Sequence, residues 1–265
     1  MGNHTRCKKH NRRGPFAGGS LAFIALCLAI SCQSASGQSG PDPLPLFRAA
    51  QAGDVVAIEQ ALASGIDVNA IDSGFRPLMV AASQGHLEAV QVLIARGARL
   101  EEPARDGGGR ALHFAAMGGH CTVTSFLLDQ GADKEAQDGD GYTALWSAAS
   151  RGHIDCVELL LQRGANLNHV DQHGNNIVGA CARFGANDAI RWLVRRGVAS
   201  DQPNRYMRTP LFDAIDGGHP DTVRLLIQLG ADVNRRTASG NTPLLNASQR
   251  GRSDIASILR SAGAR

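Results

Sequence analysis

The sequence predicts an all-α solenoid of about seven short units, each composed of a helix, a turn, a second helix and a loop. The first observation is a ladder of apolar residues, which are separated by 32, 34 and then four times 33 residues. Self-similarity at a fixed spacing of this size is typical of a stacked array. The ladder consists of Leu46, Leu78, Leu112, Leu145, Val178, Leu211 and Leu244.

Two glycine ladders run in the same register and are the second observation. Glycine tolerates the left-handed backbone conformation that commonly ends a helix. We therefore expect one ladder to end the first helix of each unit and the other, twelve residues later, to end the second helix. The first of these ladders consists of Gly53, Gly85, Gly119, Gly152, Gly185, Gly218 and Gly251.

A small residue at one shared position of each first helix is the third observation. A small side chain there lets neighbouring units approach closely. The position is occupied by Ala49, Ala81, Ala115, Ala148, Cys181, Ala214 and Ala247. Two of the first helices also have a threonine and a proline at their start, Thr209-Pro210 and Thr242-Pro243. These predict an N-cap hydroxyl followed by a proline at the first helical position.

The motifs within these units resemble those of the ankyrin-repeat family. Residues 209–214 read Thr-Pro-Leu-Phe-Asp-Ala, Gly218 precedes His219, and residues 230–234 read Gly-Ala-Asp-Val-Asn. The units lie near 45–74, 75–108, 109–141, 142–174, 175–207, 208–240 and 241–265. The resemblance covers residues 45–265. It implies an array that binds another protein through its concave surface, formed by the loops between units (the fingers) and the exposed side of the first helices.

The terminal units depart from the pattern, as the water-facing ends of a stacked array require. Asp54 and Arg252 stand where most inner units have histidine, and Arg260 replaces an apolar residue of the last helix. We expect the array to be complete, with no second domain.

The N-terminus has the layout of an export signal, which we assign to residues 1–36. Five basic residues within positions 6–13 precede the apolar segment Leu21–Ile30. Ten helical residues span only about half of a hydrocarbon core roughly 30 Å thick, so the segment is short for a transmembrane helix. Residues 37–44, which are rich in Ser, Gly and Pro, are expected to form a flexible tether.

Two processing sites remain open. Small residues at positions 34–36 suit a leader peptidase, whereas Leu28–Cys32 loosely resembles a bacterial lipoprotein box, with Cys32 as the lipidated residue and a membrane tether. We expect an exported protein of the periplasm or cell envelope. The alternatives are a secreted effector that binds proteins of another cell, and a cytosolic adaptor with an uncleaved N-terminal anchor.

The charge of the array does not favour nucleic acid as a partner. Without residues 1–36, the chain carries 22 basic and 24 acidic residues. Neutralising phosphates requires a sustained basic surface. We therefore expect a protein partner and no nucleic acid.

No pattern of residues indicates catalysis or a cofactor. The histidines that follow the first glycine ladder are expected to be structural, because they recur at repeat spacing. A metal-dependent enzyme using His169, Asp171 and His173 is the weaker alternative. Cys121, Cys156 and Cys181 lie at different repeat positions, so we predict no disulfide.

The resemblance assigns partner binding to aromatic and arginine side chains of the fingers and first helices, types that are enriched in interface hot spots. These residues are Phe75, Tyr142, Trp146, Arg151, His173, Arg183, Phe184, Arg205, Tyr206, Arg208 and Arg250. Unit five departs most from the family, since Gly179 replaces a side chain and Met207 stands where glycine is expected. We expect units four to six to form the main contact patch and to favour an acidic segment of the partner.

Overall fold

The computed structural model describes residues 41–265, except for the side chain of Asp106. These residues form fourteen α-helices and no strand, which confirms the predicted all-α class. The expected signal and Cys32 lie outside the described residues, as does the first half of the expected tether. Within the described range, no helix combines the length and apolarity needed to cross a bilayer.

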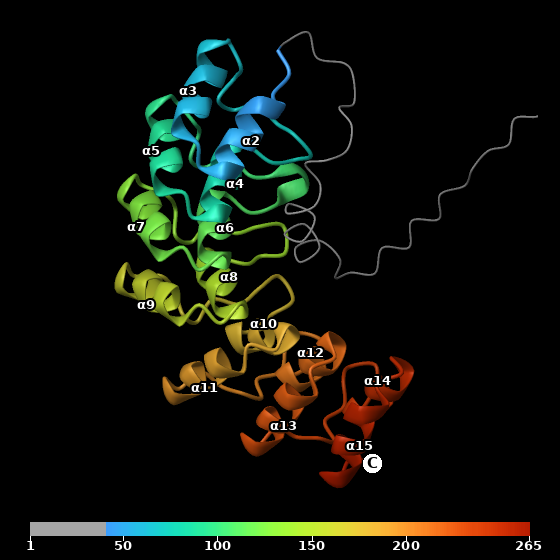
Figure 1. The fold of residues 1–265 in the computed structure, drawn as a ribbon. Helices are drawn as coiled ribbons and strands as arrows, with labels where there is room; N and C mark the ends of the chain where they lie inside the picture. The colour runs from blue at the N-terminus through green and yellow to red at the C-terminus, as the bar shows by residue number, and fades with distance from the viewer. Residues whose placement is uncertain (1–40) are drawn as a thin grey trace, which may run out of the picture. The chain divides into compact units, whose positions relative to one another are not determined.

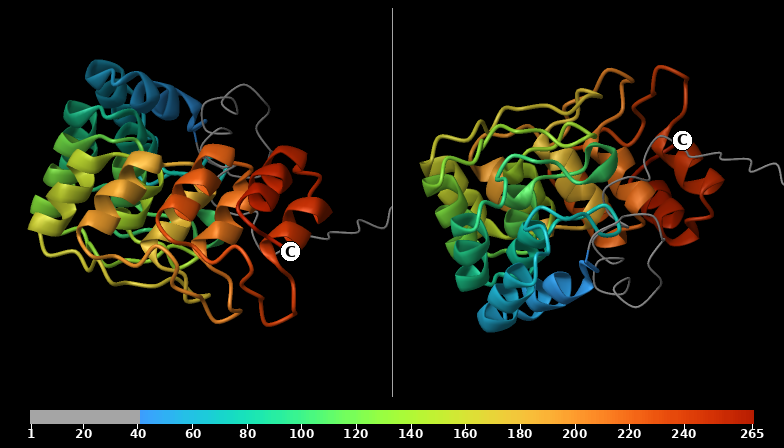
Figure 2. Two further views of the ribbon diagram at one scale, coloured as in Figure 1. Left: turned by 90° about the horizontal axis from the view of Figure 1, so that it is seen from below. Right: turned by 90° about the horizontal axis from the view of Figure 1, so that it is seen from above.

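The helices alternate between two rows (Figure 1). The first helices are α2 (Leu44–Ala52), α4 (Pro77–Gln84), α6 (Ala111–Met117), α8 (Ala144–Ser150), α10 (Ile177–Phe184), α12 (Pro210–Gly217) and α14 (Pro243–Gln249). The second helices are α3 (Val55–Ala63), α5 (Leu87–Ala95), α7 (Cys121–Asp129), α9 (Ile154–Gln162), α11 (Asn187–Arg195), α13 (Pro220–Gln228) and α15 (Ser253–Ser261). The fingers project together on one side of the helices, and one of them contains a short 3-10 helix, Arg105–Gly107 (Figure 2).

The two glycine ladders end the helices as predicted. All fourteen of these glycines have φ between 69° and 91°, a conformation that side chains with a Cβ rarely adopt. The two threonine caps differ from each other. The Thr242 hydroxyl accepts a hydrogen bond from the Leu245 amide, whereas Thr209 is the N-cap of α12 without a side-chain cap bond. The predicted cap at Thr209 is therefore wrong.

The core runs continuously between the two rows of helices. The first six residues of the apolar ladder, Leu46 to Leu211, are 0–2% exposed, and the seventh, Leu244 in the last unit, is half-buried. The small residue of each first helix is likewise buried, Cys181 included. Neighbouring first helices therefore pack closely, and burial of aliphatic side chains stabilises the stack.

Histidines after the first glycine ladder join four of the units to the unit before. In each case the imidazole Nε2 contacts a main-chain carbonyl of the preceding first helix, and the ring packs on that helix's terminal glycine. The pairs are His86 with Gln51 at 3.0 Å, His120 with Ser83 at 2.9 Å, His153 with Met117 at 3.0 Å and His219 with Arg183 at 3.0 Å. These histidines are structural, as predicted.

The prediction that no disulfide forms is wrong. Cys121 and Cys156 form a disulfide between α7 and α9, the second helices of units three and four. The different repeat positions misled the sequence argument, because equivalent residues of two stacked helices point the same way, so the side chains that meet between α7 and α9 come from different positions. The two Cα atoms lie 5.0 Å apart, within disulfide range. Cys181 is a buried free thiol.

Removing the disulfide is expected to destabilise the array. The bridge closes a sequence separation of 35 residues, so the double variant Cys121→Ser/Cys156→Ser should lose about 3–4 kcal/mol of unfolding free energy. Urea unfolding with and without reductant measures this. Reductant should destabilise the wild type and leave the double variant unchanged; equal wild-type curves under both conditions contradict the bridge.

Candidate protein-binding surface

The first-helix face, formed by the fingers and the exposed side of the first helices, carries most of the residues predicted to bind a partner. Trp146 lies beneath this face, with a side chain that is 1% exposed. The Tyr142 ring stacks on it with centroids 5.1 Å apart, and the His169 ring meets it edge-on at 6.0 Å. Burial raises the pKa of Tyr142, so its hydroxyl stays protonated. Trp146 therefore supports Tyr142, which is half-buried and the more exposed of the two rings.

Units four and five meet on this face through a cation and a ring. The Arg151 guanidinium lies 4.9 Å from the centre of the Phe184 ring. Both side chains are half-buried. The contact places an arginine and an aromatic residue, both predicted to bind the partner, directly beside each other.

Asp213 of α12 lies on the floor of the face and binds an arginine from the preceding unit. The Arg183 Nη2 atom donates a hydrogen bond to its Oδ1 atom at 2.7 Å. Burial raises the pKa of Asp213 to about 6, against the opposing effect of Arg183 and Arg208. The carboxylate is thus costly to bury and depends on its arginine partners.

Asp216, one helical turn further along α12, binds groups from two other elements. Its Oδ2 atom accepts a hydrogen bond from Arg208 Nη2 at 2.7 Å, and its Oδ1 atom lies 2.6 Å from Arg250 Nε. Asn246 Nδ2 donates to the same Oδ1 atom at 2.8 Å. The finger before α12 and the helix α14 are therefore both attached to this carboxylate.

Gly179 makes room for Asp213. A Cβ atom at position 179 would lie 3.1 Å from the Asp213 Oδ2 atom. The equivalent positions in the neighbouring units hold the buried rings of Trp146 and Phe212. A glycine inside a helix costs about 1 kcal/mol relative to alanine, so a spatial reason for it is informative. The departure noted in the sequence allows a carboxylate to occupy this part of the face.

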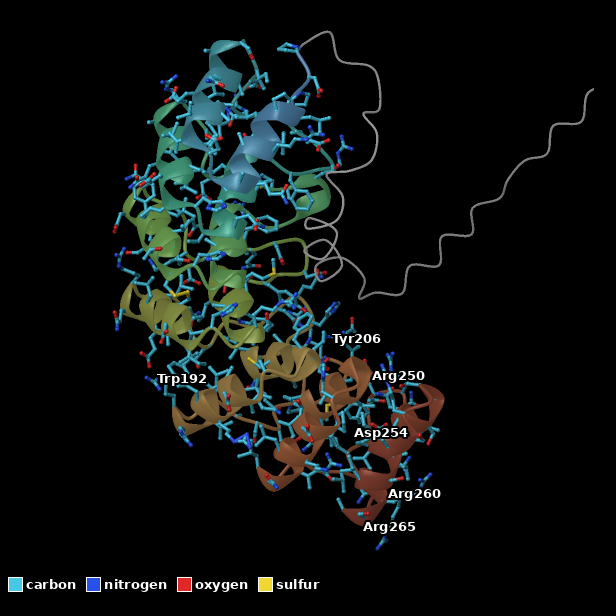
Figure 3. All side chains as sticks on the ribbon, viewed as in Figure 1. Trp192, Tyr206, Arg250, Asp254, Arg260 and Arg265 are labelled. Atoms are coloured by element: carbon cyan, nitrogen blue, oxygen red, sulfur yellow. A yellow bond between two sulfur atoms is a disulfide. The ribbon has the colours of Figure 1, made fainter. Side chains whose placement is uncertain are left out.

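The finger before α12 presents an apolar tip. Tyr206 and Met207 are 52% and 43% exposed, and the Tyr206 ring lies 5.9 Å from the His173 ring of the preceding finger. Arg205 fastens the two fingers together, because its amide donates to the His173 carbonyl and its guanidinium to the Gln172 carbonyl. Figure 3 shows Tyr206 and Arg250 on one side of the array and Trp192, on a second helix, on the other.

Phe75 lies apart from these residues. Its ring meets Phe114 at 5.6 Å in a small apolar cluster of units two and three, together with Met79, Ala104 and Met117. The structure therefore brings together the predicted residues of units four to seven and leaves Phe75 in a separate patch.

Sequence reasoning missed Asp213 and Asp216. A signal was present, since two aspartates three residues apart share one side of a first helix. Arg250 follows its partner Asp216 by 34 residues, one repeat length, and Arg183 precedes its partner Asp213 by 30.

The histidines and aspartate of the metal alternative have structural roles in their finger. His169 Nε2 contacts the Gly141 carbonyl at 2.8 Å, and Asp171 accepts hydrogen bonds from the His173 and Asn175 amides. In residues 41–265, no three His, Cys, Asp or Glu side chains form a group suited to a metal ion.

Comparison with known families identifies the array. The family described as "Ankyrin repeats (3 copies)" matches residues 23–104, 100–171 and 178–265. The chain belongs to the ankyrin-repeat family. The crystal structure of the human ASB11 ankyrin repeat domain is similar, with a TM-score of 0.64 and 25% sequence identity over 82% of this chain and 97% of that one. The search of curated proteins gave no significant match.

The apolar tip of this ankyrin finger is held in a strained conformation. Met207 has φ of 58°, where the equivalent residue of the next finger is Gly240 at 83°. A left-handed conformation costs a residue with a Cβ atom roughly 1–2 kcal/mol. Glycine avoids this cost but loses more backbone entropy on folding, which offsets part of the gain.

Replacing the methionine should therefore stabilise the array. We expect Met207→Gly to raise the unfolding free energy by about 0.5–1 kcal/mol, measured by urea unfolding. The converse variant Gly240→Met is the matched control and should lower it by a similar amount. A loss of stability in Met207→Gly would show that methionine contacts at the tip outweigh the strain.

Proposed function

We propose that this ankyrin array is a non-catalytic module that is exported to the cell envelope and binds a partner protein through the first-helix face of units four to seven. Ankyrin repeats generally serve as protein–protein interaction modules. The observation that carries the proposal is the convergence of Arg183, Arg208 and Arg250 on Asp213 and Asp216, on one stretch of this face close to Tyr142.

The composition of this stretch favours binding over chemistry. It combines the half-buried pair of Arg151 and Phe184 with the exposed ring of Tyr206. Arginine and aromatic side chains contribute most of the binding free energy in many protein interfaces. The carboxylates of α12 are engaged by arginines, and Asp171 is engaged by its own finger, so these acids serve structure on this face.

Two observations support export. The first 36 residues have the layout of a signal, and the disulfide between Cys121 and Cys156 is of a kind that persists in oxidising compartments. Lipidation of Cys32 would hold the array at a membrane, whereas cleavage after position 36 would release it. Both forms leave the first-helix face of the array intact.

Affinity capture from an envelope extract tests the proposal. The bait is the processed chain, beside the triple variant Arg183→Ala/Phe184→Ala/Tyr206→Ala and a control variant, Arg163→Ala/Trp192→Ala. The control changes exposed or half-buried side chains at the second helices. We expect one protein to be retained by the wild type and the control and to be lost from the triple variant.

Export is tested by mass spectrometry. The chain is isolated from each cell fraction and its intact mass is measured. A chain in the envelope or medium that lacks residues 1–36, or one that starts at an acylated Cys32, agrees with the proposal. A full-length chain confined to the cytosol contradicts export. Equal retention of every captured protein by the wild type and the triple variant contradicts the assigned surface.

A further inference from the structure

The charged groups of the first-helix face are arranged in two layers. The side chains of Asp213 and Asp216 are each 5% exposed, whereas those of Arg183, Arg208 and Arg250 are 19%, 20% and 45% exposed. A molecule that approaches this face therefore meets guanidinium groups before it meets carboxylates.

Asp213 and Asp216 bind arginines from three successive units. Arg183 comes from α10, Arg208 from the finger before α12, and Arg250 from the residue that follows α14. All three converge on two carboxylates of α12. We call Arg183, Arg208 and Arg250 the arginine layer. Because a bound guanidinium has already lost side-chain freedom, its further binding to a partner costs less entropy.

The remaining charge of the array is distributed differently. The chain outside residues 1–36 has two more acidic than basic residues. Exposed acids lie in the first turns of the second helices α9, α11, α13 and α15, namely Asp155, Asp188, Asp221 and Asp254. The same helices also carry exposed arginines, among them Arg191, Arg195 and Arg224, so the charge of this row is mixed. The arginine layer has three guanidinium groups against two carboxylates, so it keeps a net positive charge that attracts an acidic segment.

We propose that the partner presents an acidic segment to the arginine layer, and that Asp213 and Asp216 are positioning residues that hold the guanidinium groups toward its carboxylates. This inference rests on the proposed function and names the class of partner. Guanidinium and carboxylate groups match in geometry and form charge-assisted hydrogen bonds, so side chains of Asp and Glu are the complementary chemistry.

A pair of peptides tests the partner class. Fluorescence anisotropy of the purified chain is measured with a labelled peptide of alternating glutamate and serine, and with its lysine and serine counterpart. We expect saturable binding of the glutamate peptide that weakens between about 50 and about 200 mM salt, because salt screens exposed charges. The lysine peptide should not bind.

The variant Asp216→Asn separates positioning from net charge. If net charge alone decided affinity, removing a negative charge would strengthen binding of the glutamate peptide. If Asp216 positions Arg208 and Arg250, the same variant should weaken it by about tenfold, close to the loss expected for Arg208→Gln/Arg250→Gln. Asp221→Asn is the matched control, because Asp221 is an exposed acid of the same unit; we expect a change within about twofold.

The outcomes are distinct from those of the capture experiment. Equal binding of both peptides overturns the inference, and so does tighter or unchanged binding by a folded Asp216→Asn variant. If circular dichroism shows that this variant does not fold, Arg250→Gln, which changes an exposed side chain, decides instead, and unaltered binding overturns the inference. If a captured protein is lost from the triple variant while the glutamate peptide does not bind, the proposed function stands and the acidic partner is wrong.

Discussion

The close approach of neighbouring first helices is the constraint on which the rest of this structure depends. A small residue in the middle of each first helix permits it, and in four units the histidine after the helix binds the first helix of the unit before. Because units then stack one repeat apart, residues separated by about 33 positions lie next to each other in space. Arg250 follows its partner Asp216 by 34 residues and Arg183 precedes its partner Asp213 by 30, so the stacking that builds the fold also builds the ion pairs of the surface.

The junction between units four and five is built differently from its neighbours. Ala186 stands where other inner units have histidine, and a Cβ atom at Gly152 would meet no atom within 4 Å. Other contacts join these units, since the Cys181 thiol donates to the Ala149 carbonyl and Glu158 binds both Trp192 and Arg196. The contact of Arg151 with Phe184 crosses the same junction on the first-helix face. The candidate surface thus includes the place where the repeated link is replaced by side-chain pairs particular to this chain.

The fold could be predicted from the sequence because its signals are periodic. Ladders of leucine, glycine and alanine report burial and helix ends at every unit, and the left-handed conformation expected for each ladder glycine is present. The positive φ of Met207 follows from the same register.

Features that break the period were harder to predict. The disulfide of Cys121 and Cys156 depends on which side chains of neighbouring second helices face each other, and a comparison of equivalent repeat positions does not reveal this. The two aspartates of α12 depend on side-chain direction, as does the burial of Trp146 beneath Tyr142. The family resemblance assigned several arginines to this face, but only the packing shows that buried carboxylates bind them.

The central claim is that a buried carboxylate of α12 gives the arginine layer its ability to bind acidic groups. A double-mutant cycle for glutamate-peptide affinity, with Arg250→Gln and Asp216→Asn alone and together, tests it most directly. If Asp216 holds Arg250 in its binding position, Arg250→Gln should cost several-fold in the wild type and less than about twofold once Asp216 is asparagine. An equal loss in both backgrounds would show that Arg250 acts without its carboxylate, and would contradict the account.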